Sequence, residues 1–179
     1  REEIGQLPNL IEGILNERSG FIHGIAHRRM NFRNWLYLGR GLYYAIAMES
    51  ALKMKEVTYL HAEGMPAGFL KHGTISLIDE HMATMIFIPP PGSGELYSLT
   101  LSSAEEIKAR GGYILGVHSE GDEEDEEICD ESIGIPSGPG VVIPFLHLLA
   151  GQLFAYFTAT GLKRNIDRPR SLAKSVTVA

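Results

Sequence analysis

The segment Trp35-Leu36-Tyr37-Leu38-Gly39-Arg40-Gly41 decides the fold of this chain. Four consecutive apolar residues that end at a glycine are typical of a strand buried on both faces of a parallel sheet. Residues 43–60 follow with apolar side chains at helical period. We therefore predict a strand, a tight turn and a helix over residues 35–60, which is the repeating unit of an α/β fold.

The same alternation continues along the rest of the chain. The predicted strands span residues 35–38, 84–88, 113–117 and 132–135, and the predicted helices span 6–18, 21–33, 43–60, 96–110 and 143–162. Strands that alternate with helices imply a parallel sheet, here of four or five strands, with helices on both faces. We predict one domain over residues 1–179, with a helical lead-in arm at 1–33, an α/β core at 35–162 and a tail at 163–179.

The formal charge of −6 is concentrated in one place. Nine acidic residues fall between Glu120 and Glu131, and the rest of the chain is slightly basic. Like charges repel each other and extend the chain, so we interpret this run as a solvated loop. No basic stripe with interleaved aromatic residues is present in the sequence, and we expect no nucleic-acid partner.

Cysteine content and apolar runs bear on the compartment. A single cysteine, Cys129, cannot build an internal disulfide framework, and we expect a cytoplasmic setting. The apolar stretch 141–162 is interrupted by Pro144 and His147, so a buried core helix explains it better than a membrane span, and no membrane partner is expected. The chain begins at Arg1 inside a helical pattern, and we interpret it as a fragment of a longer polypeptide.

Ligands of open parallel sheets bind beyond the carboxyl ends of the strands. Gly39-Arg40-Gly41, the loop after Ile88 and His118-Ser119 should therefore line one edge of the sheet. The first of these segments could begin a dinucleotide fingerprint, but Tyr44 stands at the third glycine position. We interpret the two glycines as the requirement of a tight turn, and we expect no cofactor and no metal ion.

Three charged residues share one face of the helix predicted over 43–60. Glu49, Lys53 and Glu56 are four and then three residues apart, so their side chains project together. Taken alone, such a ladder is typical of a solvent-exposed charged face. A second polar cluster, from His61 to Gly73, follows on a short glycine-bounded segment.

These clusters belong to a set of motifs that together resemble a known family. Five motifs occur in order: Leu38-Gly39-Arg40-Gly41, Ala51-Leu52-Lys53-Met54-Lys55-Glu56, His61-Ala62-Glu63-Gly64, Leu70-Lys71-His72-Gly73, and the C-terminal segment from Asp167 to Val178, DRPRSLAKSVTV. From about residue 6 to the end, the chain resembles the second sugar-isomerase (SIS) half of the isomerising glutamine-fructose-6-phosphate aminotransferases. The resemblance and the strand pattern agree on a three-layer αβα sandwich with a parallel, flavodoxin-like sheet, the SIS fold.

The resemblance implies an activity and a set of catalytic residues. Enzymes of this family transfer glutamine-derived ammonia to fructose 6-phosphate and isomerise the product to glucosamine 6-phosphate. By resemblance, Lys174 forms a Schiff base with the sugar carbonyl, Glu56 moves a proton between C1 and C2, and His72 opens the sugar ring. In the family this histidine comes from the neighbouring subunit, so the resemblance implies a homodimer.

The remaining implied contacts are to the substrate. Glu49 and Lys53 flank the proton-transferring carboxylate, and Ala173 adjoins the Schiff-base lysine in the tail, which we expect to close the active site. The family's phosphate cradle lies mainly in the upstream SIS half, and ammonia comes from a glutaminase domain. Both are expected partners of this chain, and we expect the isolated fragment to be weakly active or inactive.

Two departures from the family pattern and two alternatives stand beside this interpretation. The family often has Gly-Glu-Leu-Lys-His-Gly-Pro where this chain has Gly68-Phe69-Leu70-Lys71-His72-Gly73-Thr74. One alternative is an SIS-type sugar-phosphate deaminase or isomerase that uses the same lysine and glutamate without glutamine. The other is a non-catalytic module that binds sugar phosphates.

Overall fold

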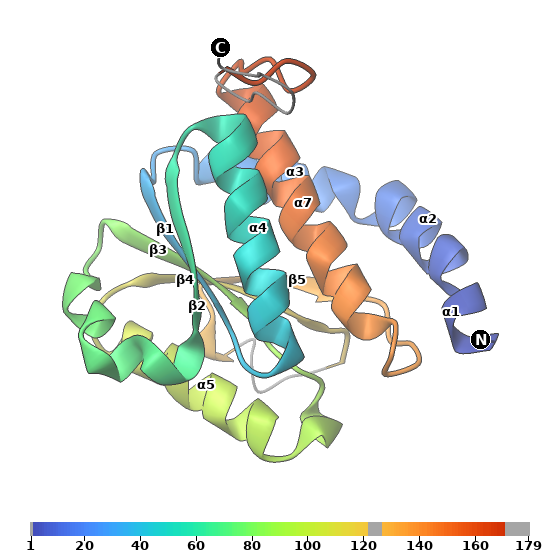
Figure 1. Ribbon diagram of the computed structural model, residues 1–179, viewed down its shortest axis with the longest axis horizontal. Helices are drawn as coiled ribbons and strands as arrows, with labels where there is room; N and C mark the ends of the chain where they lie inside the picture. The colour runs from blue at the N-terminus through green and yellow to red at the C-terminus, as the bar shows by residue number, and fades with distance from the viewer. Residues whose placement is uncertain (1, 122–126, 171–179) are drawn as a thin grey trace, which may run out of the picture.

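A five-stranded parallel sheet forms the centre of the computed structural model, which describes residues 2–121 and 127–170 (Figure 1). The strands are β1 (Asn34–Gly39), β2 (His61–Pro66), β3 (Met82–Phe87), β4 (Tyr113–Ser119) and β5 (Glu131–Ile135). Their order is β2-β1-β3-β4-β5, and every neighbouring pair is parallel. This order is that of flavodoxin-like folds and confirms the predicted doubly wound sheet.

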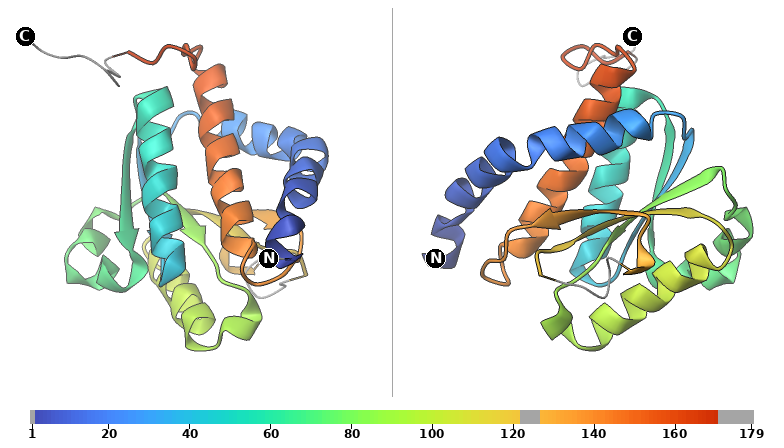
Figure 2. Two further views of the ribbon diagram at one scale, coloured as in Figure 1. Left: turned by 45° about the vertical axis from the view of Figure 1, so that its right-hand side comes forward. Right: turned by 180° about the vertical axis from the view of Figure 1, so that it is seen from behind.

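Helices cover both faces of the sheet, as Figures 1 and 2 show. The α-helices are α1 (Glu2–Gly5), α2 (Leu7–Glu17), α3 (Ser19–Arg28), α4 (Leu42–Thr58), α5 (Glu95–Lys108) and α7 (Ile143–Gly161), and the 3-10 helices are η1 (Ala67–His72), η2 (Thr74–Leu77) and η3 (Pro91–Ser93). One face carries α3, α4 and α7, and the other carries α5 with η1 and η2. The fold is therefore the predicted three-layer sandwich.

Strand β1 shows why the sequence runs are apolar throughout. Trp35 and Tyr37 point into the core under α4 and α7, whereas Leu36 and Leu38 point into the core under α5. Side chains alternate between the faces of a strand, so a strand covered on both faces needs apolar residues at every position. All six residues of β3 and all seven of β4 are buried for the same reason.

Helix α7 is long and apolar enough to cross a membrane by composition alone. Ten of its nineteen residues are buried, including Phe154 and His147, and it packs along α4 and α3. The helix therefore serves as a core element of the sandwich, as the interruptions by polar residues predict.

Two details differ from the sequence-based expectation. Residues 61–66 form the edge strand β2, whereas their sequence indicates only a polar glycine-bounded segment. Only Ala62 and Met65 of this strand are buried, so its sequence lacks the continuous apolar run of an inner strand. The second arm helix ends at Arg28 and not at residue 33, because the chain turns there to enter β1.

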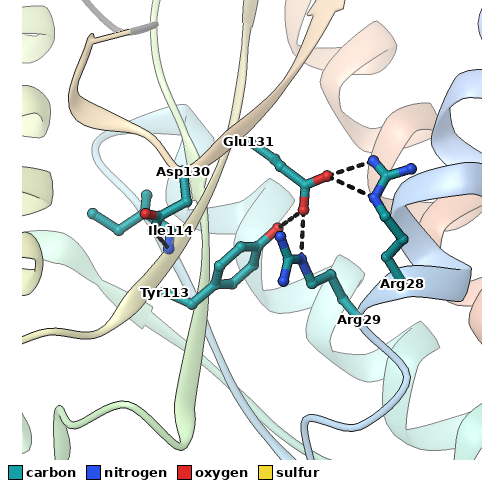
Figure 3. Close-up of polar contacts among 6 residues, drawn as sticks. All are labelled: Arg28, Arg29, Tyr113, Ile114, Asp130 and Glu131. Carbon is teal, nitrogen blue, oxygen red and sulfur yellow. Dashed lines mark hydrogen bonds and ion pairs between the residues drawn. The ribbon is translucent and has the colours of Figure 1, made fainter.

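The carboxylate of Glu131 joins the lead-in arm to the sheet (Figure 3). Glu131 of β5 accepts hydrogen bonds from the hydroxyl of Tyr113 at 2.8 Å, from Nε of Arg29 at 2.5 Å and from Arg28. Burial alone would raise the pKa of Glu131, but the hydrogen bonds from the two arginines and the tyrosine outweigh burial and lower it. The carboxylate therefore stays ionised and holds α3 against the edge of the sheet.

Candidate functional site

Glu49, Lys53 and Glu56, the charged ladder predicted on α4, are in contact with one another through Lys53. Nζ of Lys53 lies 2.7 Å from Oε2 of Glu56 and 3.4 Å from Oε1 of Glu49. The exposed fractions of the Glu49, Lys53 and Glu56 side chains fall in that order, 41%, 30% and 22%. The three groups are therefore accessible from one side and become more enclosed toward the C-terminal end of the helix.

The charge state of Lys53 follows from this geometry. Its hydrogen bond to Glu56 raises the pKa of Lys53, and the charge of Glu49 adds to the effect against a smaller loss from burial. Lys53 is therefore an ammonium group at neutral pH. A lysine that attacks a carbonyl must be a neutral amine, so Lys53 is suited to holding carboxylates in place and unsuited to nucleophilic attack.

An apolar groove adjoins the ladder on the outer surface of α4 and α7. Its volume is about 320 Å³, and it is lined by Lys53, Val57, Leu149, Gln152, Leu153, Ala155, Tyr156 and Ile166. Leu149, Gln152 and Tyr156 are three and four residues apart, so they form one stripe on α7. The sequence contains this spacing and indicates a core helix, but it does not show that the stripe lines a groove.

The segment after α7 runs past the C-terminal end of α4. The backbone N–H of Arg170 donates to the hydroxyl of Tyr59 at 2.8 Å, and the Arg170 guanidinium lies 4.3 Å from the centre of the same ring. Arg164 lies 5.1 Å from that ring centre. Tyr59 ends α4 with φ of 66°, three residues beyond Glu56. Sequence reasoning missed Tyr59, because no local pattern shows that two distant arginines meet it.

Two predicted site residues of the tail, Ala173 and Lys174, lie outside the described residues. The last described residue is Arg170, and its contact with Tyr59 brings the chain to the end of α4 that carries Glu56. The described part of the tail thus passes the end of α4 that carries the ladder.

His72 lies far from the ladder within one chain. It is the exposed last residue of η1, which follows the carboxyl end of β2. Glu56 lies in the last turn of α4, which leads to the amino end of β2. The six residues of β2 separate the two positions by about 20 Å along the strand. One chain therefore does not bring His72 and Glu56 into a single site.

Polar residues also gather at the carboxyl ends of β4 and β5. A cavity of about 300 Å³ is lined there by Arg18, Phe21, His118, Glu120, Gly121, Ser132 and Gly134. Arg18 and Glu120 form an ion pair, which leaves little net charge in this cavity. Within residues 2–121 and 127–170, no group of three or more His, Cys, Asp or Glu residues is arranged to hold a metal ion.

The strand order and the charged face on the first crossover helix define the class of protein. This is a doubly wound α/β domain. Its charged cluster of Glu49, Lys53 and Glu56 lies on α4, the helix that follows β1. Residues 31–160 match the family model of the SIS domain. The chain belongs to the SIS domain family.

Similar proteins have been named and solved. The chain is 49% identical over 99% of its length to a glutamine–fructose-6-phosphate aminotransferase (isomerizing) of Methanococcus maripaludis and 43% identical over 97% to that of Aquifex aeolicus. It spans only 28% of the length of each of these relatives.

Solved structures give the same relationship. The C-terminal domain of glucosamine-fructose-6-phosphate aminotransferase from Francisella tularensis superposes with a TM-score of 0.85 at 33% identity, over 94% of this chain and 47% of that one. Tagatose-6-phosphate ketose/aldose isomerase from Escherichia coli superposes with a TM-score of 0.76 at 22% identity, over 90% of this chain and 44% of that one. The second likeness shows a shared fold only.

Proposed function

We propose that this chain is the second SIS half of an isomerising glutamine-fructose-6-phosphate aminotransferase, which makes glucosamine 6-phosphate from fructose 6-phosphate. The observation that carries the proposal is 49% identity across 99% of the chain to an enzyme of that name. The ladder on α4 supports it, because the reaction needs a carboxylate that exchanges protons with a sugar carbon.

Lys174 is the proposed nucleophile. Its amine adds to C2 of the open-chain ketose and expels water, which leaves a Schiff base. Lys53 is a poor candidate for this step, because its contact with Glu56 keeps it protonated. Lys174 is four positions beyond Arg170, and a fully extended backbone of that length reaches about 14 Å. A lysine on this tail can therefore reach Glu56 from the anchor at Tyr59.

Glu56 is the proposed proton carrier. Ammonia first adds to C2 of the Schiff base and releases the amine of Lys174, which leaves an imine that carries the new nitrogen. The carboxylate of Glu56 then takes a proton from C1 of this imine and returns it to C2, which leaves the amino aldose. Lys53 and Glu49 fix the carboxylate on the helix face and are placed to contact sugar hydroxyls. Ala173 precedes the nucleophile in the sequence and is the proposed substrate contact of the tail at 163–179.

His72 is the proposed ring-opening residue, and it serves a second copy of the chain. The separation of His72 from Glu56 supports this assignment, because a site that uses both residues needs two subunits. The functional unit is thus a homodimer of the longer chain.

The upstream SIS half and the glutaminase domain complete the enzyme. The upstream half supplies the phosphate cradle, and its docking would cover the apolar groove between α4 and α7. The glutaminase domain supplies ammonia in the cytoplasm. The isolated 179-residue chain is therefore expected to have weak activity or none.

Borohydride trapping tests the covalent step. The chain is incubated with fructose 6-phosphate and borohydride, alone and extended through the upstream half, and its mass is measured. A sugar-sized adduct is expected on the longer protein that includes the upstream half. The adduct is expected to vanish in Lys174→Ala. Lys55→Ala, at an exposed lysine of α4, is the matched control and should keep the adduct. An adduct that survives Lys174→Ala would contradict the assignment of the nucleophile.

Glutamine dependence separates the proposal from its alternatives. The full-length chain should form glucosamine 6-phosphate with glutamine as nitrogen donor. Turnover only with free ammonia would indicate a deaminase, and conversion to an aldose without any nitrogen donor would indicate an isomerase. Sugar-phosphate binding without turnover or adduct would indicate a binding module.

A further inference from the structure

The residues on either side of Arg40 fix the position of its backbone. It stands between β1 and α4, and its carbonyl accepts the N–H of Tyr43 at 3.0 Å. A Cβ at Gly39 would collide with the backbone of Tyr43, and Gly41 has φ of 54°, a conformation that favours glycine. The two glycines are thus needed for the turn itself, whereas neither constraint requires an arginine between them.

The guanidinium of Arg40 connects two elements on the α5 side of the sheet. Nη2 donates to Oγ of Ser103 in α5 at 3.1 Å, and the same hydroxyl donates to the carbonyl of Leu99 at 3.1 Å. A Cβ added to Gly68 of η1 would lie 3.0 Å from Nη1 and 3.8 Å from Cζ of Arg40. The guanidinium therefore occupies the space that a side chain at position 68 would take.

Two further contacts hold the same short helix. Leu70 is fully buried in the core under α5, and Nζ of Lys71 lies 2.6 Å from Oε1 of Glu106 in α5. His72 is the next residue and is exposed. Arg40, Leu70 and Lys71 thus hold η1 on one side, while His72 is left free to contact another molecule.

Nε of Arg40 is buried and has no hydrogen-bond partner among the residues that the structure describes. An unpaired buried donor costs free energy, so stability alone does not explain an arginine at this position. A role in placing η1 does explain it, because the planar guanidinium bonds Ser103 through Nη2 while Nη1 lies against Gly68.

We propose that Arg40 is a positioning residue for His72: it sets where η1 lies on α5 and thereby where the imidazole meets the sugar ring. This inference rests on the proposed function and deepens it. In ring opening the C2–O5 bond of the furanose breaks, O5 gains a proton, and the C2 hydroxyl loses its proton to become the carbonyl. An imidazole transfers such protons only when it is correctly placed, and a displacement of about 1 Å can cost a factor of about 100.

5-Deoxyfructose 6-phosphate separates ring opening from every later step. It lacks O5, so it cannot close to the furanose and reaches the Schiff-base lysine as the open ketone. A defect in His72 or in its placement should therefore slow turnover of fructose 6-phosphate and spare turnover of the deoxy analogue.

The experiment compares kcat/KM for both substrates in the full-length chain. Arg40→Lys and Gly68→Ala should each lower kcat/KM for fructose 6-phosphate by about 10-fold and that for the deoxy analogue by less than about 2-fold. His72→Asn should show the same selectivity with a loss of about 100-fold. Arg33→Lys, at an exposed arginine beside β1, is the matched control and should change neither value. The ratio of the two values is independent of how much variant is folded.

Three outcomes decide the matter. If neither substrate is converted by the unaltered chain, the proposed function fails. If His72→Asn shows the selectivity and Arg40→Lys and Gly68→Ala do not, the proposed function stands and the positioning role is overturned. Equal losses on both substrates in Arg40→Lys would also overturn it, because they would mean a general structural defect.

Discussion

Lys53 lies between two carboxylates on α4, and its pairing decides what each group can do. Exposed pairs at this spacing stabilise a helix by only about 0.3–0.5 kcal/mol, so substitutions here should affect catalysis more than folding. The raised pKa of Lys53 keeps a positive charge beside Glu56. That charge lies 2.7 Å from Oε2 of Glu56 and holds the carboxylate on the helix face.

Glu56→Gln should abolish proton transfer and leave binding nearly intact. The amide keeps the size of the side chain but cannot take a proton, so kcat of the full-length chain should fall by about 100- to 1,000-fold with little change in KM. Steady-state kinetics checks this. Glu63→Gln, at an exposed glutamate of β2, is the control and should leave kcat unchanged. An unchanged kcat in Glu56→Gln would assign the proton transfer to another group.

His147 is a second residue whose environment sets its charge. Its ring nitrogens lie 3.0 Å from the carbonyl oxygen of Ile143 and 3.1 Å from that of Ile88. Burial lowers the pKa of His147 to about 4, against the effect of these carbonyls. A neutral imidazole has one N–H, so only one carbonyl receives a hydrogen bond at neutral pH.

The stability of the protein should therefore depend on pH through His147. Between pH 6.5 and 4 the unfolded chain binds a proton that the folded chain does not, so the free energy of unfolding should fall by roughly 3 kcal/mol as the pH decreases across this range. Urea unfolding at several pH values measures this. In His147→Gln the decrease should be smaller by that amount, and in His81→Gln, at an exposed histidine, it should match the unaltered chain. Equal pH dependence in all three would contradict the prediction.

Close contacts between elements hold both outer strands of the sheet, β2 and β5. At one edge β2 packs closely on α4, since a Cβ at Gly64 would lie 2.6 Å from Cα of Met48. At the other edge, Glu131 joins β5 to α3, and the carboxylate of Asp130 accepts the N–H of Ile114 at 2.7 Å (Figure 3). The mostly buried carboxylate of Glu131 thus provides two of the polar contacts of the arm with the sheet, to Arg28 and Arg29.

Glu131→Gln should loosen the arm. The amide cannot balance two arginines, so the free energy of unfolding at pH 7 should fall by about 2–3 kcal/mol. Because the pKa of Glu131 is lowered by folding, its contribution is present at neutral pH and is lost as the pH falls through the folded-state pKa. The difference between the variant and the unaltered chain should therefore shrink in acid. Glu80→Gln, at a glutamate whose side chain is 80% exposed, is the control for both measurements.

At the scale of the whole molecule, Glu56 and His72, which we assign to one reaction, lie at opposite ends of the strands. α4 must run from the carboxyl edge back to the amino edge, because it connects two parallel neighbouring strands. Glu56 therefore lies beside the amino ends of the strands, whereas η1 carries His72 beside their carboxyl ends. A site that contains both residues, as we propose, would therefore need two copies of the chain.

Mixed dimers test this arrangement directly. Full-length chains with Glu56→Gln and with His72→Asn should each be nearly inactive as homodimers. A mixed dimer has one site with both residues intact and one with neither, so it should recover about half of the activity of the unaltered dimer. Differently tagged chains allow the mixed dimer to be purified and assayed. Without recovery, each site would have to take both residues from one chain.

Much of the fold could be predicted from the sequence, because periodicity alone reports which side of an element faces the core. The inner strands, the crossover helices and the common face of Glu49, Lys53 and Glu56 all follow from local spacing. Strand β2 could not be predicted in this way, because it buries only two side chains and has no continuous apolar run.

The sequence by itself determined the alternation of strands and helices, the parallel sheet, and the residue types available for sugar chemistry. Only the tertiary structure decided which distant residues meet: Arg170 with Tyr59, Arg40 with Gly68, and Glu56 apart from His72. The reason is physical. Local spacing fixes the direction of a side chain within its own element, whereas contacts between elements depend on strand order and on how closely helices pack against the sheet.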